Sequence, residues 1–156
     1  MEWFIDLISN RFFITGVAAW TIAQVAKAII HAIIHKKWVW ERIIGDGGMP
    51  SGHSATVTSL ATISALTYGF NSFQFAVTSL LAIIVCHDAM GVRLETGKQA
   101  VIIKELAKAF EDLTKEDLPE VKLKEFVGHT PVQVLAGICV GILAGCLMHF
   151  VVFPIF

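Results

Sequence analysis

The chain has 156 residues, of which 55% are hydrophobic and 16% are charged, and its mean hydropathy is +0.69. A soluble domain of this length usually has about a quarter of its residues charged and cannot bury so much apolar surface. The composition therefore excludes an ordinary soluble protein and favours an integral membrane protein. A formal net charge of -1 excludes the basic field that is typical of nucleic-acid-binding proteins.

The N-terminus carries Glu2 and Asp6 in place of a basic segment, so we expect no cleavable signal peptide. Four stretches then approach the roughly 20 mostly apolar residues that a membrane-spanning helix needs. They cover residues 12–35, 53–70, 73–92 and 130–153. The three cysteines lie in apolar runs without metal-type spacing and predict core packing.

Residues 93–127 form a charged segment in which Lys alternates with Glu or Asp. Its apolar residues recur at helical spacing, which predicts an amphipathic helix that lies on the membrane surface or covers the bundle. We therefore expect a single all-α membrane domain over residues 1–156. It is a polytopic helical bundle of about four transmembrane helices plus one amphipathic helix on the cytoplasmic side.

Basic residues near the ends of the spans predict the orientation, because cytoplasmic loops carry an excess of Lys and Arg. The loops after the first and third spans contain Lys36, Lys37, Arg42, Arg93, Lys98 and Lys104. The other side offers Arg11. We expect both charged loops to face the cytoplasm and both termini to lie outside, in a bacterial plasma membrane.

Polar residues interrupt the first span at Gln24, Lys27 and His31, which are three and four residues apart and share one helix face. A Lys near mid-span costs about 3 kcal/mol on insertion scales, so it normally faces a polar interior or a partner. Alternatively, Lys27 extends to the cytoplasmic surface. A polar stripe of this kind would also suit a transporter or channel subunit, which would have to oligomerise.

A second polar cluster, at residues 47–54, reads Gly-Gly-Met-Pro-Ser-Gly-His-Ser. Ser51 is a suitable N-cap for the following helix. The amides of Gly52 and His53 would then lie at a positive helix end, which suits an anion. An ordinary glycine-rich loop with a helix cap would show the same local pattern.

Two further clusters lie at the ends of the third and fourth spans. Asp88 and Arg93 follow one another closely at the end of the third span, where they could simply neutralise each other. His129 precedes a proline at the start of the fourth. With four spans, His53, Arg93 and His129 fall on the same membrane side, which predicts a shared site.

Histidines, an arginine, a buried lysine and a helix N-terminus suit a phosphate ester, because cationic donors stabilise the charge on the phosphoryl oxygens. One neutral histidine can attack phosphorus while a protonated one donates to the leaving oxygen. A divalent ion on His53, His87, Asp88 and His129 is the alternative. No short ligand pair joins these four, so we expect neither a metal nor another cofactor.

At these residues the sequence resembles a known family. Residues 50–53, Pro-Ser-Gly-His, match the central motif of the type 2 phosphatidic acid phosphatase superfamily, which includes vanadium-dependent haloperoxidases. The segments GGMPSGHSA, DAMGVR with the following GKQA, and GHTPVQVLAG resemble the divergent branch of that superfamily, which consists of small membrane proteins. The resemblance covers nearly the whole chain.

The resemblance implies roles for individual residues. His129 would be the nucleophile, His53 the acid that protonates the leaving group, and Arg93 the phosphate clamp, although the family's arginine normally lies six residues before the histidine. Ser51 and Gly52 would belong to the phosphate-binding loop. Lys27 could represent the lysine of the first motif, and Arg42 a substitute for the arginine that normally follows it.

Gln133 departs from the family pattern, because the family has an aspartate there that orients the nucleophilic histidine. An amide can hold the ring but cannot stabilise an imidazolium as a carboxylate does. We hypothesise that Asp88 supplies this charge from another helix.

The predicted function is therefore hydrolysis of a lipid phosphomonoester through a phosphohistidine, at the cytoplasmic face of the membrane. A non-catalytic descendant that binds phospholipid headgroups or anions is the alternative, and a transporter or channel subunit is another. The expected partners are a lipid phosphate and the membrane. Gly137, Gly141 and Gly145 form a small-residue face, which would support either a homo-oligomer or close packing within the chain.

Overall fold

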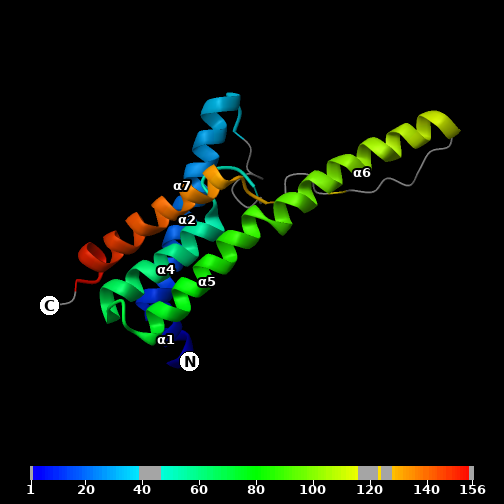
Figure 1. The fold of residues 1–156 in the computed structure, drawn as a ribbon. Helices are drawn as coiled ribbons and strands as arrows, with labels where there is room; N and C mark the ends of the chain where they lie inside the picture. The colour runs from blue at the N-terminus through cyan, green and yellow to red at the C-terminus, as the bar shows by residue number, and fades with distance from the viewer. Residues whose placement is uncertain (1, 39–46, 116–122, 124–127, 155–156) are drawn as a thin grey trace.

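The computed structural model describes residues 2–38, 47–115, 123 and 128–154. Within these residues every regular element is helical, so the prediction of an all-α fold is confirmed. Arg42 lies outside the described residues. The helices are α1 (Glu2–Ser9), α2 (Arg11–His35), α4 (Gly52–Tyr68), α5 (Phe73–Met90), α6 (Val92–Thr114) and α7 (Pro131–Leu147), which a short π-helix, η1 (Met148–Val152), continues (Figure 1).

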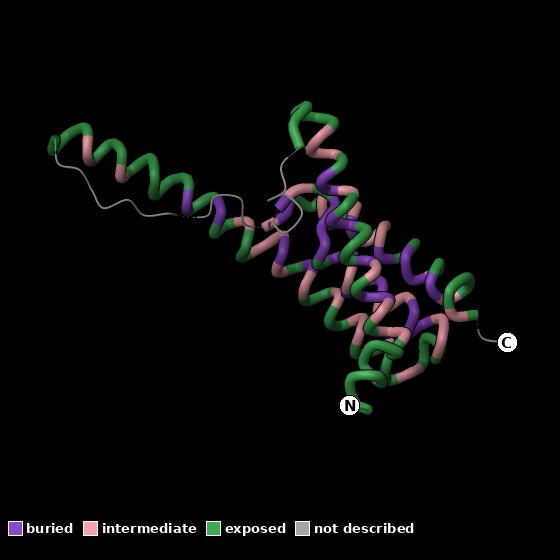
Figure 2. Tube along the Cα trace, turned by 180° about the vertical axis from the view of Figure 1, so that it is seen from behind, coloured by how far each residue is buried: buried purple, intermediate pink, exposed green. Residues whose placement is uncertain are grey.

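Three helices in the described residues are long and apolar enough to cross a membrane. They are α2, α5 taken together with the α6 that follows it, and α7 with η1. The remaining helix of the bundle, α4, has 17 residues and lies among α2, α5 and α7 (Figure 2). The count of four crossings therefore stays a prediction, which requires the central helix α4 to span the bilayer as well.

Small and hydroxylated residues allow α4 to occupy the centre of the bundle. Its most deeply buried residues are Ser54, Ala55, Ser59, Ile63 and Ser64. Because hydroxyl groups need hydrogen-bond partners away from water, hydroxyl side chains of α4 donate to backbone carbonyl oxygens of the same helix. The hydroxyl of Ser59 donates to the carbonyl oxygen of Thr56 at 2.7 Å. The hydroxyl of Thr56 donates to the carbonyl oxygen of Gly52 at 2.9 Å. Because these side chains are small and satisfied within α4, neighbouring helices can approach its backbone closely.

The glycine face of α7 packs against α4. A Cβ atom added at Gly137 would lie 2.5 Å from the carbonyl oxygen of Ser51, and one added at Gly141 would lie 2.5 Å from that of Ala55. A Cβ at Gly145 would lie 2.7 Å from Cβ of Thr62. All three glycines are buried. Of the two predicted uses of this face, the structure shows close packing within the chain, and a homo-oligomer is not shown.

Capping residues mark the helix starts that matter for the site. Ser51 caps α4, Ser72 caps α5 and Thr130 caps α7, each by accepting a backbone amide through its side chain. A short turn at residues 69–72 makes α4 and α5 antiparallel neighbours. The amide of His129 donates to the carbonyl oxygen of Ala89 at 2.9 Å. The start of α4, the end of α5 and the start of α7 therefore meet at one end of the bundle.

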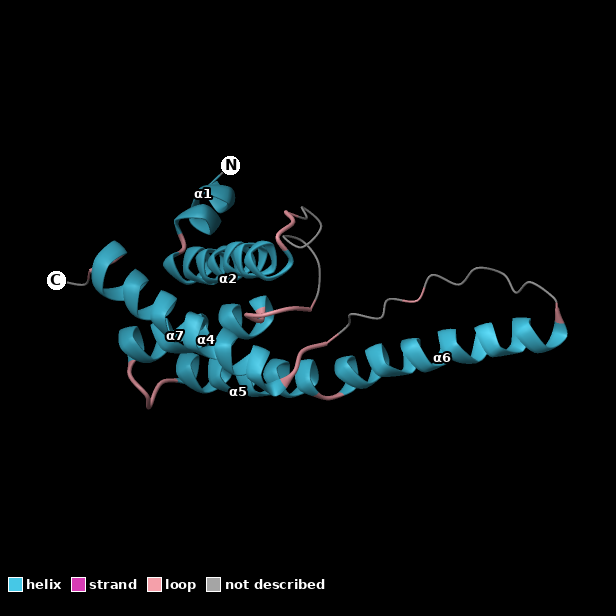
Figure 3. Ribbon diagram, turned by 90° about the horizontal axis from the view of Figure 1, so that it is seen from above, coloured by secondary structure: helices cyan, strands magenta, loops and turns pink. Residues whose placement is uncertain are grey.

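The charged segment begins with α6, which continues almost in line with α5 and projects beyond the bundle (Figure 3). In the described residues it packs chiefly on α5. Its apolar face is exposed at Ile102, Ile103, Leu106, Phe110 and Leu113. The amphipathic helix is therefore present, but in this conformation it does not cover the bundle.

Candidate functional site

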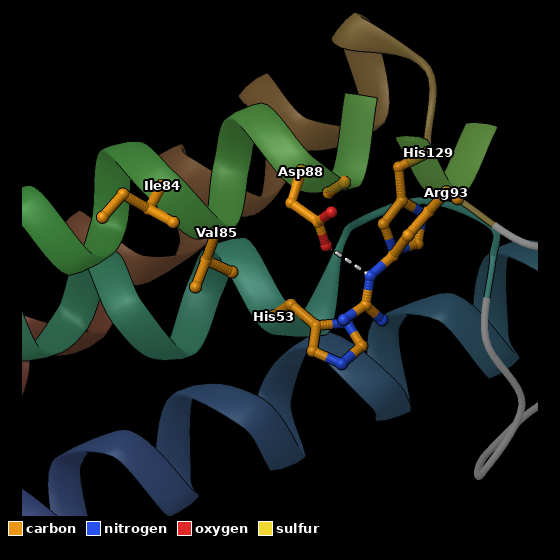
Figure 4. A pocket seen from close by; sticks show the side chains of 8 residues that line it. His53, Ile84, Val85, Asp88, Arg93 and His129 are labelled. Atoms are coloured by element: carbon orange, nitrogen blue, oxygen red, sulfur yellow. Dashed lines mark hydrogen bonds and ion pairs between the residues drawn. The ribbon is translucent and has the colours of Figure 1, made fainter. Parts of the chain in front are cut away.

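A cavity of about 210 Å³ opens where the three helix ends meet. Four polar or charged side chains line it: His53 of α4, Asp88 of α5, Arg93 of α6 and His129, which directly precedes the N-cap of α7. Ile84, Val85, Ala89 and Gly128 complete the wall (Figure 4). The predicted convergence of the two histidines and Arg93 is therefore present as a geometric fact, whereas their chemical roles stay predictions.

Backbone hydrogen bonds hold the two histidines opposite each other. The amide of Ser51 donates to the carbonyl oxygen of Gln133 at 3.0 Å, which joins the start of α4 to the first turn of α7. His53 lies in the first turn of α4 and is exposed, whereas His129 is buried. Their ring centroids are 6.4 Å apart. Both imidazoles therefore line the same cavity.

Gly128 explains how Arg93 reaches the site from the far side of a long segment. It has a φ of +87°, and an added Cβ would lie 2.6 Å from the carbonyl carbon of Arg93. Gly128 is therefore in backbone contact with Arg93 and Leu94. Sequence reasoning took the distance from Arg93 to His129 as a departure from the family pattern. In space Arg93 and His129 are nevertheless close, because Gly128 packs against the backbone of Arg93.

Asp88 contacts Arg93 rather than His129. Arg93 Nε donates to Asp88 Oδ2 at 2.6 Å, with side chains that are 49% and 41% exposed. An ion pair this exposed contributes about 0–1 kcal/mol to stability. Of the two interpretations of Asp88, mutual neutralisation with Arg93 is the one that the contact supports.

Gln133 takes part in a capping box at the start of α7. Its side-chain oxygen accepts the amide of Thr130 at 3.1 Å, and the Thr130 hydroxyl accepts the amide of Gln133 at 3.4 Å. This arrangement satisfies two amides at the helix end. It uses Gln133 in the helix start itself, so orientation of His129 by Gln133 stays a prediction.

Lys27 lies in a different place from the two histidines. It is 4% exposed, and its side chain runs beside Gly48. It lines a second cavity of about 350 Å³ together with His31, His35 and Gln133. Ser51 and Gly52 are buried at the start of α4 and are not among the lining residues of the 210 Å³ cavity. The phosphate-binding roles of these three residues therefore stay predictions.

Sequence reasoning missed the contributions of Gly128 and Ala89. Gly128 permits the close approach of two chain segments, and the carbonyl oxygen of Ala89 anchors His129. The available signal for Gly128 was a glycine directly before the histidine of a motif. For Ala89 there was no signal, because a backbone acceptor leaves no mark on side-chain type.

Comparison with known proteins agrees with the resemblance seen in the sequence. The model of a family described as the divergent PAP2 family matches residues 8–144. The uncharacterized membrane protein YuiD of Bacillus subtilis (strain 168) is 40% identical over 147 residues, which cover 88% of this chain and 93% of that protein. No solved structure matches the chain.

Proposed function

Because the chain belongs to the divergent PAP2 family, we propose that it hydrolyses a phosphomonoester on the headgroup of a membrane lipid through a phosphohistidine intermediate. One observation carries the proposal. One cavity at the end of an apolar helical bundle is lined by three residues from separate parts of the sequence, His53, Arg93 and His129. We further propose that this cavity lies on the cytoplasmic side of a bacterial plasma membrane.

In the first step a ring nitrogen of His129 attacks phosphorus, and the bond from phosphorus to the ester oxygen breaks. The protonated His53 gives its proton to that oxygen, so the lipid leaves as a neutral alcohol. The two rings line one cavity with centroids 6.4 Å apart, which supports their acting on the same phosphoryl group. Arg93 lines the same cavity and would stabilise the charge on the equatorial oxygens.

In the second step water attacks the phosphohistidine. His53, now neutral, takes a proton from that water, and the bond from phosphorus to the His129 nitrogen breaks. Inorganic phosphate leaves, His129 is free again, and His53 has regained its proton. Atoms and charge therefore balance without any metal or redox cofactor.

The walls of the cavity favour a lipid over a soluble ester. Ile84 and Val85 of α5 line it, and Ile84 is 64% exposed on the outer surface of the bundle. Leu80 and Ile83 continue this exposed apolar surface along α5. An acyl chain could therefore remain in the bilayer beside α5 while the headgroup enters the cavity between the two histidines.

The capping role of Gln133 favours the second candidate, a non-catalytic protein that binds phospholipid headgroups. No carboxylate occupies this position, and the amide oxygen of Gln133 accepts the Thr130 amide. An amide in place of the family's carboxylate at this position would make the histidine a weaker nucleophile. Headgroup binding would need the same cavity and Arg93 but no attack by His129.

The experiment that separates these functions is phosphate release from a panel of lipid phosphates by the purified protein in liposomes. His129→Ala and His53→Ala are assayed beside the wild type. His87→Ala is the matched control, because His87 lies on the last turn of α5 and is exposed outside the lining of the cavity. We expect release by the wild type and by the His87 variant and none by His129→Ala.

A folded wild-type protein that releases no phosphate from any lipid in the panel would reject hydrolysis. Binding of the same lipids, measured in parallel by co-sedimentation with the liposomes, would then identify a headgroup-binding protein. Equal release by wild type and His129→Ala would reject the phosphohistidine.

A further inference from the structure

The contact between Asp88 and Arg93 depends on the break between α5 and α6. In a continuous helix, residues five apart point about 140° away from each other, so their side chains do not meet. Here α5 ends at Met90 and α6 begins at Val92. Gly91 between them has φ -100° and ψ -104°, and its amide donates to the carbonyl oxygen of His87 at 2.9 Å. This local turn brings Arg93 Nε within 2.6 Å of Asp88 Oδ2.

Asp88 occupies one edge of the guanidinium and leaves the other available. The bond goes to Nε, and within the described part of the chain this is the hydrogen bond that Arg93 makes. The terminal nitrogens point toward His53 and the cavity (Figure 4). A guanidinium binds phosphate through two parallel N–H groups, for which the pair of terminal nitrogens is suitable. The carboxylate therefore holds Arg93 at the edge that a phosphate does not need.

We propose that Asp88 is a positioning residue for Arg93, which it holds with its terminal nitrogens facing the space between His53 and His129. This inference rests on the proposed function, because it assigns Arg93 to a phosphoryl group. It differs from orientation of His129 by Asp88, the hypothesis drawn from the sequence. The Arg93 side chain is half-exposed, and its contact with the carboxylate selects one of its many rotamers. Without the carboxylate, the guanidinium would adopt several rotamers that point its N–H groups into solvent.

The sign of the effect separates positioning from simple electrostatics. Removing a negative charge beside an anion site, by itself, makes anion binding tighter. Loss of a correctly held guanidinium makes it weaker. Asp88→Asn keeps the size of the side chain and removes the charge, so weaker phosphate binding in this variant would indicate that position outweighs charge.

The test measures the dissociation constant of inorganic phosphate for the full-length protein in detergent, by titration calorimetry. Asp88→Asn, Arg93→Ala and the double variant form a double-mutant cycle. Asp88→Asn should weaken binding roughly ten- to a hundredfold, the range for one charge-assisted hydrogen bond. The double variant should bind no more weakly than Arg93→Ala, and Asp88→Glu should recover part of the loss.

Glu95→Gln is the matched control. Glu95 accepts from Lys98 Nζ at 2.7 Å in an exposed ion pair on α6, outside the lining of the cavity. Like Asp88→Asn, the substitution Glu95→Gln removes one negative charge near the junction of α5 and α6. It should leave the dissociation constant of phosphate unchanged. Circular dichroism and gel filtration check that every variant is folded.

Three results would overturn the positioning role. They are unchanged or tighter phosphate binding by Asp88→Asn, a loss that persists in full in the Arg93→Ala background, and a wild type that binds no phosphate. The second result would point to an effect through His129. A wild type that binds phosphate and shows the expected cycle but releases none from lipids would reject hydrolysis and leave the role of Asp88 in place.

Discussion

Gly128 packs against the backbone of Arg93, although the two residues are far apart in the sequence. A Cβ atom at Gly128 would lie 2.6 Å from the carbonyl carbon of Arg93. The next residue, His129, lines the same cavity as Arg93. The residues on either side of the charged segment therefore line one cavity.

We predict that Gly128→Ala severely reduces phosphate release. The added methyl group collides with the backbone at Arg93, and the positive φ of +87° is a further strain of about 1–3 kcal/mol for a residue with a side chain. Relief of the collision would move His129 and Arg93 apart. Initial rates on the best lipid of the panel measure the effect.

Gly69→Ala is the matched control for this variant. Gly69 has a φ of +84° but no atom within 4 Å of an added Cβ. It lies in the turn between α4 and α5, so it tests the backbone strain without the collision. Equal losses of activity in the two variants would show that general instability, rather than displacement at the site, explains the result.

We predict that segment 95–127 can be replaced by a short Gly-Ser linker without unfolding the bundle. Leu94 and Gly128 are in backbone contact, so a few residues can join them. In the described residues α6 packs chiefly on α5. Gel filtration and thermal unfolding in detergent measure the outcome. Aggregation of the shortened chain, under conditions where the full-length protein is monodisperse, would contradict the prediction.

We predict that Gly141→Ala destabilises the protein by about 1–3 kcal/mol, the usual cost of overpacking a close contact. The new methyl group would lie 2.5 Å from the carbonyl oxygen of Ala55 and 2.9 Å from Cβ of Thr58. Gly16→Ala on α2 is the control, because its nearest atom, Cδ2 of Leu60, lies at 3.4 Å. Since Ala favours a helix over Gly, this control should be neutral or stabilising. Unfolding temperatures of the two variants should therefore move in different directions or by clearly different amounts.

We predict that Gln133→Ala lowers the stability of α7 by about 0.5–1 kcal/mol, because the Thr130 amide loses the acceptor at 3.1 Å. Gln133→Glu keeps an acceptor there and adds a negative charge at a helix N-terminus, which is favourable. It should therefore match the wild type in thermal unfolding. A destabilised Gln133→Glu together with a neutral Gln133→Ala would show that the capping box is not what this residue contributes.

We predict that His53→Ala slows release from lipid phosphates about 10²–10⁴-fold, the usual contribution of a general acid. A phosphate ester of a good leaving group, such as 4-nitrophenyl phosphate, needs no protonation of its oxygen. Its first step should therefore be nearly insensitive to His53→Ala and still be lost in His129→Ala. A burst of nitrophenolate from His53→Ala measures this step. Equal sensitivity of both substrates to His53→Ala would contradict its role as the acid.

Much of the fold follows from local features of the sequence. Apolar runs of suitable length predict the helices around Trp20, Leu80 and Leu143. Caps at Ser51, Ser72 and Thr130 mark where three of them begin. These features work locally, since a helix bonds to itself and a cap acts within one turn. The family motifs also identify the two histidines and Arg93 as candidate site residues.

Long-range packing decided what each polar residue meets. The glycine stripe of α7 could face a second copy or the chain itself, and the fit of Gly141 against Ala55 made it intramolecular. The sequence left two partners open for Asp88, Arg93 and His129, and the turn at Gly91 brings it to Arg93. Lys27 was grouped with the phosphate site and instead lines a second cavity with Gln133.

By itself, therefore, the sequence determined that this is an all-helical membrane protein of a recognisable family, because apolar length, capping and motif are local properties. The sequence also predicted a shared site for Arg93 and His129, but the tertiary structure alone decided which contact brings them to one cavity. That meeting depends on a close approach of two backbones at Gly128. Contacts between residues far apart in the chain arise from the packing of whole helices, which no local pattern of residues specifies.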